Sequence, residues 1–411
     1  MQSFSSLPLS EPLQRALRDC DFTEPTPIQI AAIPVILQGR DLRASAQTGS
    51  GKTAAFALPI LQRLQHTSSG RHGTVLILVP TRELAMQVGQ EIQLFARYLP
   101  APVKVLTIFG GVSINPQMMA LRGGADIVVA TPGRLLDLIN HNALHLATIS
   151  TLVLDEADKL LDMGFADEIA KILELLPERR QTLLFSATFP VAVKALADLI
   201  LNNPERIEIE TTQHTEPVIT QRALVVDTAQ RGPLLRHLLA TEGWQRVLVF
   251  VATQYTTEHL ADKLKRNGIV AEAFHGDLSQ WARTKALSDF KAARLQVLVA
   301  TDVAARGIDI EQLPVVVNYD LPRSAVDYIH RIGRTGRAGE TGIAVSFVTP
   351  ANEAHFHLIE KRNNFRLPRE TIAGFEVTEV ASVNQETLPG TGGIKGKRKS
   401  KKDKLREAAK H

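Results

Sequence analysis

Three carboxylates occur within four positions of the stretch "LVLDEADKLLDMGF", residues 152–165, namely Asp155, Glu156 and Asp158. They directly follow the apolar run 152–154, which predicts the end of a buried strand. A buried carboxylate is costly unless it is paired or binds a metal. The pattern therefore predicts that these side chains hold a cation, and the alternative is an exposed acidic turn that caps the next helix.

A second stretch, "AQTGSGKT" at residues 46–53, predicts a phosphate-binding loop. Its glycines allow backbone N–H groups to turn toward phosphate oxygens, and the N-terminus of the following helix favours anions. Lys52 is expected to reach the β- and γ-phosphates, and Thr53 is expected to ligate Mg²⁺. The alternative is a Gly-rich turn before a helix. The predicted nucleotide contacts are Ala46, Gln47, Thr48, Gly49, Ser50, Gly51, Lys52 and Thr53.

The phosphate loop gives the carboxylates a chemical task. Asp155, at the end of a neighbouring strand, is expected to hold the Mg²⁺ shell together with Thr53. Glu156 is placed to orient or deprotonate the attacking water. The two stretches together predict hydrolysis of a nucleoside triphosphate, with Lys52, Asp155 and Glu156 as catalytic residues.

Length and composition limit the class of protein. The chain has 411 residues, of which 44% are hydrophobic, and this suggests two or three globular domains. Its single cysteine, Cys20, excludes an internal disulfide and fits a reducing compartment. No basic region precedes a long apolar run, so we expect no signal peptide, no membrane span and a cytoplasmic location.

Positive charge is concentrated at one end of the chain. The net charge is +4, from 47 basic and 43 acidic residues. Residues 391–411 hold 9 of the basic and 2 of the acidic residues, which leaves 38 basic and 41 acidic residues in the rest. The tail is therefore the basic segment, and from about residue 390 we expect it to be disordered.

Short apolar runs alternate with amphipathic segments along both halves, which predicts an α/β fold with parallel sheets covered on both faces. The first half has such runs at 74–80, 103–109, 126–131, 150–156 and 181–188. The second has them at 222–227, 246–253, 270–276, 295–302, 314–320 and 342–348. We predict two tandem domains, 1–210 and 219–365, a linker at 211–218 and an extension at 366–411.

With "AQTGSGKT" and "DEAD" in this order, the sequence resembles the DEAD-box ATP-dependent RNA helicases of superfamily 2. Further motifs follow the family order, and the resemblance covers about residues 4 to 350. They are "FTEPTPIQ" (22–29), "PTRELA" (80–85), "GG" (110–111), "TPGR" (131–134), "SAT" (186–188), "HGDLSQWAR" (275–283), "ATDVAARGID" (300–309) and "HRIGRTGR" (330–337). The resemblance implies two RecA-like domains, ATP and Mg²⁺ as cofactors, and RNA as partner.

The resemblance also assigns residues around the nucleotide. Phe22 would stack on adenine, Gln29 would pair with its edge, and Asp309 would bind the ribose; the alternative for Phe22 is a core aromatic. The family usually has glycine where this chain has Asp21. Arg334 and Arg337 would act from the second domain as arginine fingers on the γ-phosphate. The domains would be coupled by a set consisting of Asp158, Ser186, Thr188 and His330.

RNA would lie across both domains. The resemblance implies RNA contacts from Arg82, Gly111, Thr131 and Arg134 in the first domain, and from His275, Arg283, Thr301 and Asp302 in the second. Aromatic residues make up only 5% of the chain, and no aromatic-rich stacking platform is visible. This favours contacts to the RNA backbone with little sequence specificity.

The primary hypothesis is an ATP-dependent RNA helicase that locally unwinds short duplexes or remodels RNA–protein complexes, with RNA-stimulated ATP hydrolysis. The alternative is an ATP-gated RNA clamp or scaffold with little unwinding role. A DNA translocase is disfavoured by "DEAD" and "PTPIQ". The compact core and short basic tail most resemble the bacterial RhlE-like subgroup. We expect a monomer with ribosomal or RNA-decay partners and a role in ribosome biogenesis.

Overall fold

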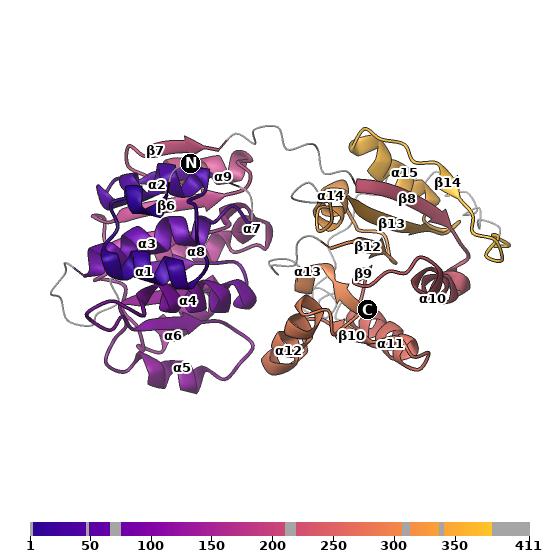
Figure 1. Ribbon diagram of the computed structural model, residues 1–411, viewed down its shortest axis with the longest axis horizontal. Helices are drawn as coiled ribbons and strands as arrows, with labels where there is room; N and C mark the ends of the chain where they lie inside the picture. The colour runs from indigo at the N-terminus through magenta and orange to yellow at the C-terminus, as the bar shows by residue number, and fades with distance from the viewer. Residues whose placement is uncertain are drawn as a thin grey trace, which may run out of the picture.

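The computed structural model describes residues 3–46, 49–65, 75–209, 219–305, 313–336 and 341–379. They form two α/β domains that lie side by side, each built on a seven-stranded sheet (Figure 1). Neighbouring strands within each sheet run parallel. The predicted α/β class with two parallel-sheet domains is therefore confirmed. The predicted linker 211–218 and the basic tail 391–411 lie outside the described residues.

The first domain begins with a 3₁₀-helix and two α-helices and then alternates strands and helices. Its sheet has the order β3-β4-β2-β5-β6-β1-β7. The strands are β1 (Leu42–Ser45), β2 (Val75–Leu78), β3 (Val105–Ile108), β4 (Ile127–Ala130), β5 (Thr151–Leu154), β6 (Gln181–Ser186) and β7 (Glu205–Glu208). The helices are η1 (Phe4–Ser6), α1 (Glu11–Asp19), α2 (Pro27–Leu37), α3 (Lys52–Leu64), α4 (Arg82–Ala96), α5 (Ile114–Leu121), α6 (Pro132–Asn140), α7 (Ala157–Asp162), α8 (Ala166–Glu174) and α9 (Val191–Ile200).

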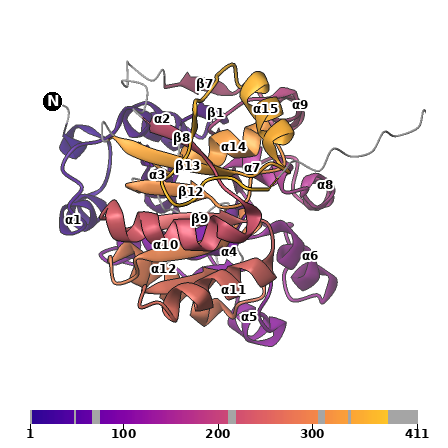
Figure 2. The same ribbon diagram turned by 90° about the vertical axis from the view of Figure 1, so that its right-hand side faces the viewer.

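The second domain, which is nearer the viewer in Figure 2, repeats this plan, with the strand order β10-β11-β9-β12-β13-β8-β14. The strands are β8 (Ile219–Val225), β9 (Val247–Val251), β10 (Ala271–Phe274), β11 (Val297–Thr301), β12 (Val315–Asn318), β13 (Gly342–Val348) and β14 (Arg369–Glu370). The helices are η2 (Thr228–Gln230), α10 (Arg231–Thr241), α11 (Gln254–Lys265), α12 (Gln280–Lys291), α13 (Asp302–Ala305), α14 (Ala325–Ile332) and α15 (Glu353–Arg362).

Both faces of each sheet are buried under helices, which explains the continuous apolar runs in the sequence. In β5, Val153 packs into one core with Phe56 and Phe185, while Leu152 and Leu154 pack into another on the opposite face. Successive side chains of a strand point to opposite faces, so only an uninterrupted apolar run fills both cores. Within the described ranges, no helix is long and apolar enough to cross a membrane.

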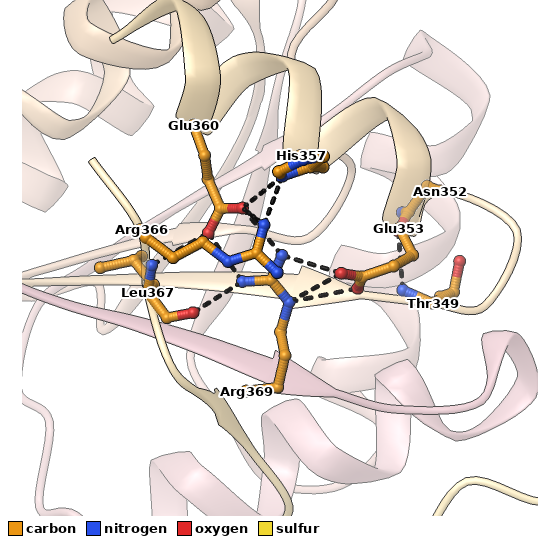
Figure 3. A network of polar contacts seen from close by, with 8 residues as sticks. All are labelled: Thr349, Asn352, Glu353, His357, Glu360, Arg366, Leu367 and Arg369. Atoms are coloured by element: carbon orange, nitrogen blue, oxygen red, sulfur yellow. Dashed lines mark hydrogen bonds and ion pairs between the residues drawn. The ribbon is translucent and has the colours of Figure 1, made fainter. Parts of the chain in front are cut away.

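The chain continues to pack on the second domain beyond residue 365. Arg369, at the start of β14, bonds the carboxylates of Glu353 and Glu360 at distances of 2.7–3.2 Å (Figure 3). The side chain of Glu360 is only 1% exposed and also accepts a hydrogen bond from Leu367 N. Burial alone would raise the pKa of Glu360, but the bonds from Arg369 outweigh it and lower this pKa to about 2.

A second anchor lies further along this segment. The carboxylate of Asp227 accepts hydrogen bonds from the backbone N–H groups of Thr378 and Glu379 at 3.0–3.1 Å, and from the Thr378 hydroxyl at 2.6 Å. These bonds lower the pKa of Asp227. Residues 369–379 therefore form part of the second domain, and their strand β14 is the edge strand that pairs with β8.

Candidate active site and RNA-binding surface

The phosphate-binding loop joins β1 to α3. Gly51 is the N-cap of α3 at φ +86°, a left-handed conformation that glycine adopts without strain. The Lys52 ammonium is 6% exposed and donates to Ala46 O at 3.0 Å, while Ala46 N bonds Ser186 O on β6. Ser50 and Thr53 flank this turn, and Gln47 and Thr48 lie outside the described residues. The N-terminus of α3, which carries a partial positive charge, thus lies beside the buried ammonium of Lys52. This combination favours the binding of an anion.

Gln29 is directly connected to this loop. Its Oε1 accepts Thr26 N at 2.9 Å and its Nε2 donates to Gly51 O at 3.1 Å. A side chain at position 51 would place Cβ only 2.4 Å from Nε2, so the contact requires glycine. Each amide atom has capacity for a second hydrogen bond, which leaves Gln29 able to pair with a base edge. The candidate for base reading is therefore bonded directly to the phosphate loop.

Phe22 precedes α2 and is half-buried. Its ring lies edge-on to Phe4 and Phe95, with centroid separations of 6.2 and 5.6 Å. Asp21 has φ +57°, which accounts for the family's usual glycine at this position. One part of the Phe22 ring packs against the core, and another part is exposed. Stacking of the exposed part on adenine stays a prediction.

Asp155 and Glu156 follow β5 and are 3% and 4% exposed. Asp155 Oδ1 accepts Glu156 N at 2.9 Å, and Lys159 Nζ lies 2.6 Å from Glu156 Oε1. Burial raises the pKa of Asp155 to about 6, although the positive charge of Lys52 acts to lower it. A bound divalent cation would offset this cost of burial, so Asp155 fits the Mg²⁺ role that the sequence suggested.

The described ranges contain no group of three or more His, Cys, Asp or Glu side chains that could hold a metal ion. This arrangement is compatible with Mg²⁺, which proteins bind through one or two side chains together with substrate phosphates. Asp155 and the neighbouring Thr53, on the first turn of α3, are therefore the residues that fit it.

Asp158, Ser186 and Thr188 form one compact cluster. Asp158 Oδ2 accepts both the backbone N–H and the hydroxyl of Thr188 at 2.9 Å. Ser186 Oγ accepts Asp158 N at 3.2 Å and donates to Thr188 O at 2.7 Å. Three of the four predicted coupling residues thus lie together in the first domain.

The fourth coupling residue, His330, lies on α14 of the second domain. It lines a small hollow together with Asp302, Arg331 and Arg334. Arg331 is 3% exposed and makes a bidentate pair with Asp302, at 2.5 and 2.7 Å, and further bonds to Asn318 and Asp320 O. Asp302 was predicted to contact RNA, but both of its carboxylate oxygens hold Arg331. Two other predicted residues, Asp309 and Arg337, lie outside the described residues.

The RNA-binding candidates of the first domain follow the carboxyl ends of three strands. Arg82 starts α4, and a Cβ on Gly111 would be 2.0 Å from its Nη1, so the guanidinium packs on that glycine. Thr131 is the N-cap of α6. Arg134 Nη2 donates to Val112 O at 2.8 Å, whereas its buried Nη1 makes no hydrogen bond within the described part of the chain. These groups form a cationic surface at one edge of the sheet.

The candidates of the second domain are less exposed than expected. Arg283 is 4% exposed; its Nη1 donates to His275 O at 2.9 Å and its Nε bonds Glu83 of the first domain at 2.7 Å. The His275 ring is 3% exposed. Thr301 ends β11 and is half-buried. In this structure Arg283 connects the two domains, beside Arg82.

Two residues with clear structural roles were not identified from the sequence. Glu83 forms the interdomain ion pair with Arg283, and Arg331 is a buried anchor within the second domain. Their partners are distant in sequence, so local spacing gives no signal for either pair.

Comparisons with known proteins agree with this architecture. Residues 26–196 match the model of the DEAD/DEAH box helicase family, and residues 230–339 match that of the helicase conserved C-terminal domain. The DEAD-box ATP-dependent RNA helicase CshA of Geobacillus kaustophilus is 42% identical over 369 residues, covering 90% of this chain and 78% of the relative. RhpA of Helicobacter pylori is 40% identical over 386 residues, covering 94% and 76%.

Solved structures show the same arrangement. Saccharomyces cerevisiae Dbp5 bound to RNA and ADP BeF3 has a TM-score of 0.76 and 34% identity, over 90% of this chain and 96% of that one. The two domains are RecA-like, as predicted. The chain belongs to the DEAD-box ATP-dependent RNA helicases, and it is an enzyme that couples ATP hydrolysis to RNA remodelling.

Proposed function

We propose that ATP and Mg²⁺ bind at the edge of the first sheet, where the phosphate loop, Gln29 and the buried carboxylates converge. The proximity of Lys52 to the raised-pKa carboxylate of Asp155 is the observation that supports this proposal most. Asp155 and Thr53 would hold Mg²⁺, which supplies positive charge to the phosphates. Glu156 accepts the proton of the attacking water, since its carboxylate follows Asp155 directly.

The second domain completes the site. Arg334 and Arg337 would stabilise the negative charge that develops on the γ-phosphate, while Asp309 would hold the ribose and Phe22 the base. Arg331 acts as a positioning residue, because its pairing with Asp302 fixes the end of α14 just before Arg334. The cluster of Asp158, Ser186 and Thr188 would face His330 when the domains close.

RNA is proposed to lie across the first-domain surface of Arg82, Gly111, Thr131 and Arg134. Arg134 supports this assignment best, because a phosphate oxygen would satisfy its buried Nη1. Contacts to the backbone rather than to bases imply local unwinding of short duplexes, or remodelling of RNA–protein complexes, with little sequence specificity. His275, Arg283 and Thr301 would contribute from the second domain.

Other features remain proposals at a finer level. They are the domain bounds 1–210 and 219–365, the second with residues 369–379 packed onto it, an RhlE-like subgroup, a monomeric state, a cytoplasmic location, and ribosomal or RNA-decay partners in ribosome biogenesis. The relatives compared above are CshA and RhpA, so the subgroup is supported only by the compact core and short basic tail.

The Glu156→Gln variant tests the catalytic assignment. We expect it to bind ATP and RNA, to lose single-turnover hydrolysis, and to persist as a complex with ATP and RNA. Asp162→Asn is the matched control, since Asp162 is an exposed carboxylate at the end of the same helix, α7. Turnover of Glu156→Gln at the wild-type rate would refute the role of Glu156. Wild-type protein that binds RNA and hydrolyses ATP but does not unwind short duplexes would favour the clamp alternative.

A further inference from the structure

A large exposed aromatic side chain lies at the start of α12; the other in the described second domain, Tyr255 on α11, stacks on the ring of His259. Trp281 is 73% exposed, whereas the only other tryptophan, Trp244, is 5% exposed and lies in the core. The ammonium of Lys285, one turn further along the helix, lies 5.2 Å from the centroid of the Trp281 ring. The indole therefore presents a flat apolar surface beside a positive charge.

Trp281 lies on a helix turn whose neighbouring residues contact the first domain. The residue before it, Gln280, is 4.0 Å from the sulfur of Met86 on α4, and Arg283 is paired with Glu83 on the same helix. Figure 1 shows α12 on the side of the second domain that faces the first domain. The neighbour of Glu83 is Arg82, which packs on Gly111 at the proposed RNA-binding surface. The contacts of Gln280 and Arg283 therefore place the first turn of α12, which carries Trp281, next to that surface.

The surroundings of Trp281 indicate what it binds. The other exposed residues of α12 are Thr284, Lys285, Ser288 and Lys291, all polar or basic. The core of a protein–protein interface is apolar and depleted of lysine, so this face is a poor protein-docking surface. A nucleotide unit fits better, because its base has a flat π-face and its phosphate is negative.

We propose that Trp281 stacks on an unpaired RNA base next to the surface of Arg82 and Arg134, with Lys285 beside the adjoining phosphate. This inference rests on the proposed RNA-binding surface and adds a base-dependent contact to it. Stacking tolerates every base but is stronger on the larger purines. The protein should therefore prefer single-stranded purine tracts, a preference that backbone contacts alone do not produce.

Tryptophan fluorescence tests the proposal directly, because only one of the two indoles is exposed. Oligo(A) should quench the emission of the full chain, whereas an abasic oligonucleotide of equal length and charge should bind with little quenching. Trp281→Ala should weaken oligo(A) binding by about tenfold, about 1.4 kcal/mol, and leave abasic binding unchanged. Trp281→Phe should fall between these, since it retains a smaller ring.

Two control variants make the outcomes distinct. Val270→Ser alters an exposed apolar residue before β10, at the opposite end of that strand from the loop to α12, and should change neither affinity. Arg134→Ala should weaken both oligonucleotides equally, which tests the RNA-binding surface itself. The stacking proposal would be overturned if Trp281→Ala lost affinity equally for oligo(A) and for the abasic oligonucleotide. It would also be overturned if the variant lost no affinity and oligo(A) did not quench the wild-type fluorescence. In either case Arg134→Ala still tests the RNA-binding surface separately.

Discussion

Replacing Asp155 by asparagine should make the first domain more stable while removing the ATPase activity. Asparagine has the same shape, and its Oδ1 can still accept the hydrogen bond from Glu156 N, which is 2.9 Å in the wild type. The substitution removes only a buried negative charge. The variant should gain stability and lose activity because the negative charge of Asp155 would bind the cation at the substrate phosphates and does not stabilise the fold.

The size of the effect follows from the pKa of Asp155, which burial raises from 3.8 to about 6 despite the opposing charge of Lys52. A folded domain that binds the proton more tightly than the unfolded chain gains stability below the unfolded pKa and loses it as pH rises through about 6. Two pKa units correspond to about 3 kcal/mol. We expect Asp155→Asn to exceed the wild type by up to about 3 kcal/mol at pH 7.5, and the gap to close toward pH 4.

The assay is urea unfolding without nucleotide or Mg²⁺, followed by far-ultraviolet circular dichroism and by tryptophan fluorescence. Both tryptophans, Trp244 and Trp281, belong to the second domain, so their emission provides an internal control that should not change. Circular dichroism should show the first domain shifted to higher urea. A variant that is less stable at pH 7.5, or a gap that is the same at pH 5 and pH 7.5, would contradict the reasoning.

Three further outcomes are expected. Arg337→Ala should lower RNA-stimulated ATP turnover by about 10³-fold with a far smaller loss of ATP affinity; turnover within a few-fold of wild type would move the finger to Arg334. Arg369→Met should destabilise the second domain by about 3 kcal/mol, measured by fluorescence in urea, because it leaves the buried carboxylate of Glu360 without this partner. The control variant Arg366→Met, at a side chain that is 63% exposed, should lower the stability by under about 1 kcal/mol. Deleting residues 391–411 should weaken RNA binding and flatten its salt dependence, by about 0.7 in slope for each phosphate released, with the maximal ATPase rate unchanged; an unchanged slope would show that the tail does not touch RNA.

The sequence predicted most central strands because both of their faces are buried. The apolar run 342–348 became β13 (Gly342–Val348) without a shift in its ends, and 74–80 contains β2 (Val75–Leu78). Strand β1, "LRAS", was not identified because Arg43 interrupts its apolar character; the guanidinium lies over the ring of Phe189 at 4.4 Å. The edge strands β7, "ERIE", and β14, "RE", were also missed. Both consist mainly of charged residues, as edge strands often do, so hydrophobicity did not identify them, whereas the edge strands β3 and β10 lie within predicted apolar runs.

The candidate site shows a similar division. The phosphate loop and the carboxylates after β5 act through backbone geometry within a few residues, so their short motifs carry enough information. The roles of Arg283 and Arg331 depend on partners 200 and 29 residues away in sequence, which only the folded chain brings together. Arg331 stands in the same motif as Arg334 and Arg337, but its burial and its pairing with Asp302 give it a role inside the second domain.

The start and the end of the second domain lie next to each other. Strand β8 opens the domain and pairs with β14 near its close, and Asp227, just after β8, holds Thr378 and Glu379. A domain whose termini are adjacent can be joined head to tail and reopened elsewhere, or inserted into a host protein, without separating strands that pair. The same adjacency sets a lower limit on the length of the domain. A fragment that ends at residue 339, where the match to the helicase C-terminal model ends, would lack β13, α15 and β14. The central strand β12 would then become an exposed edge of the sheet.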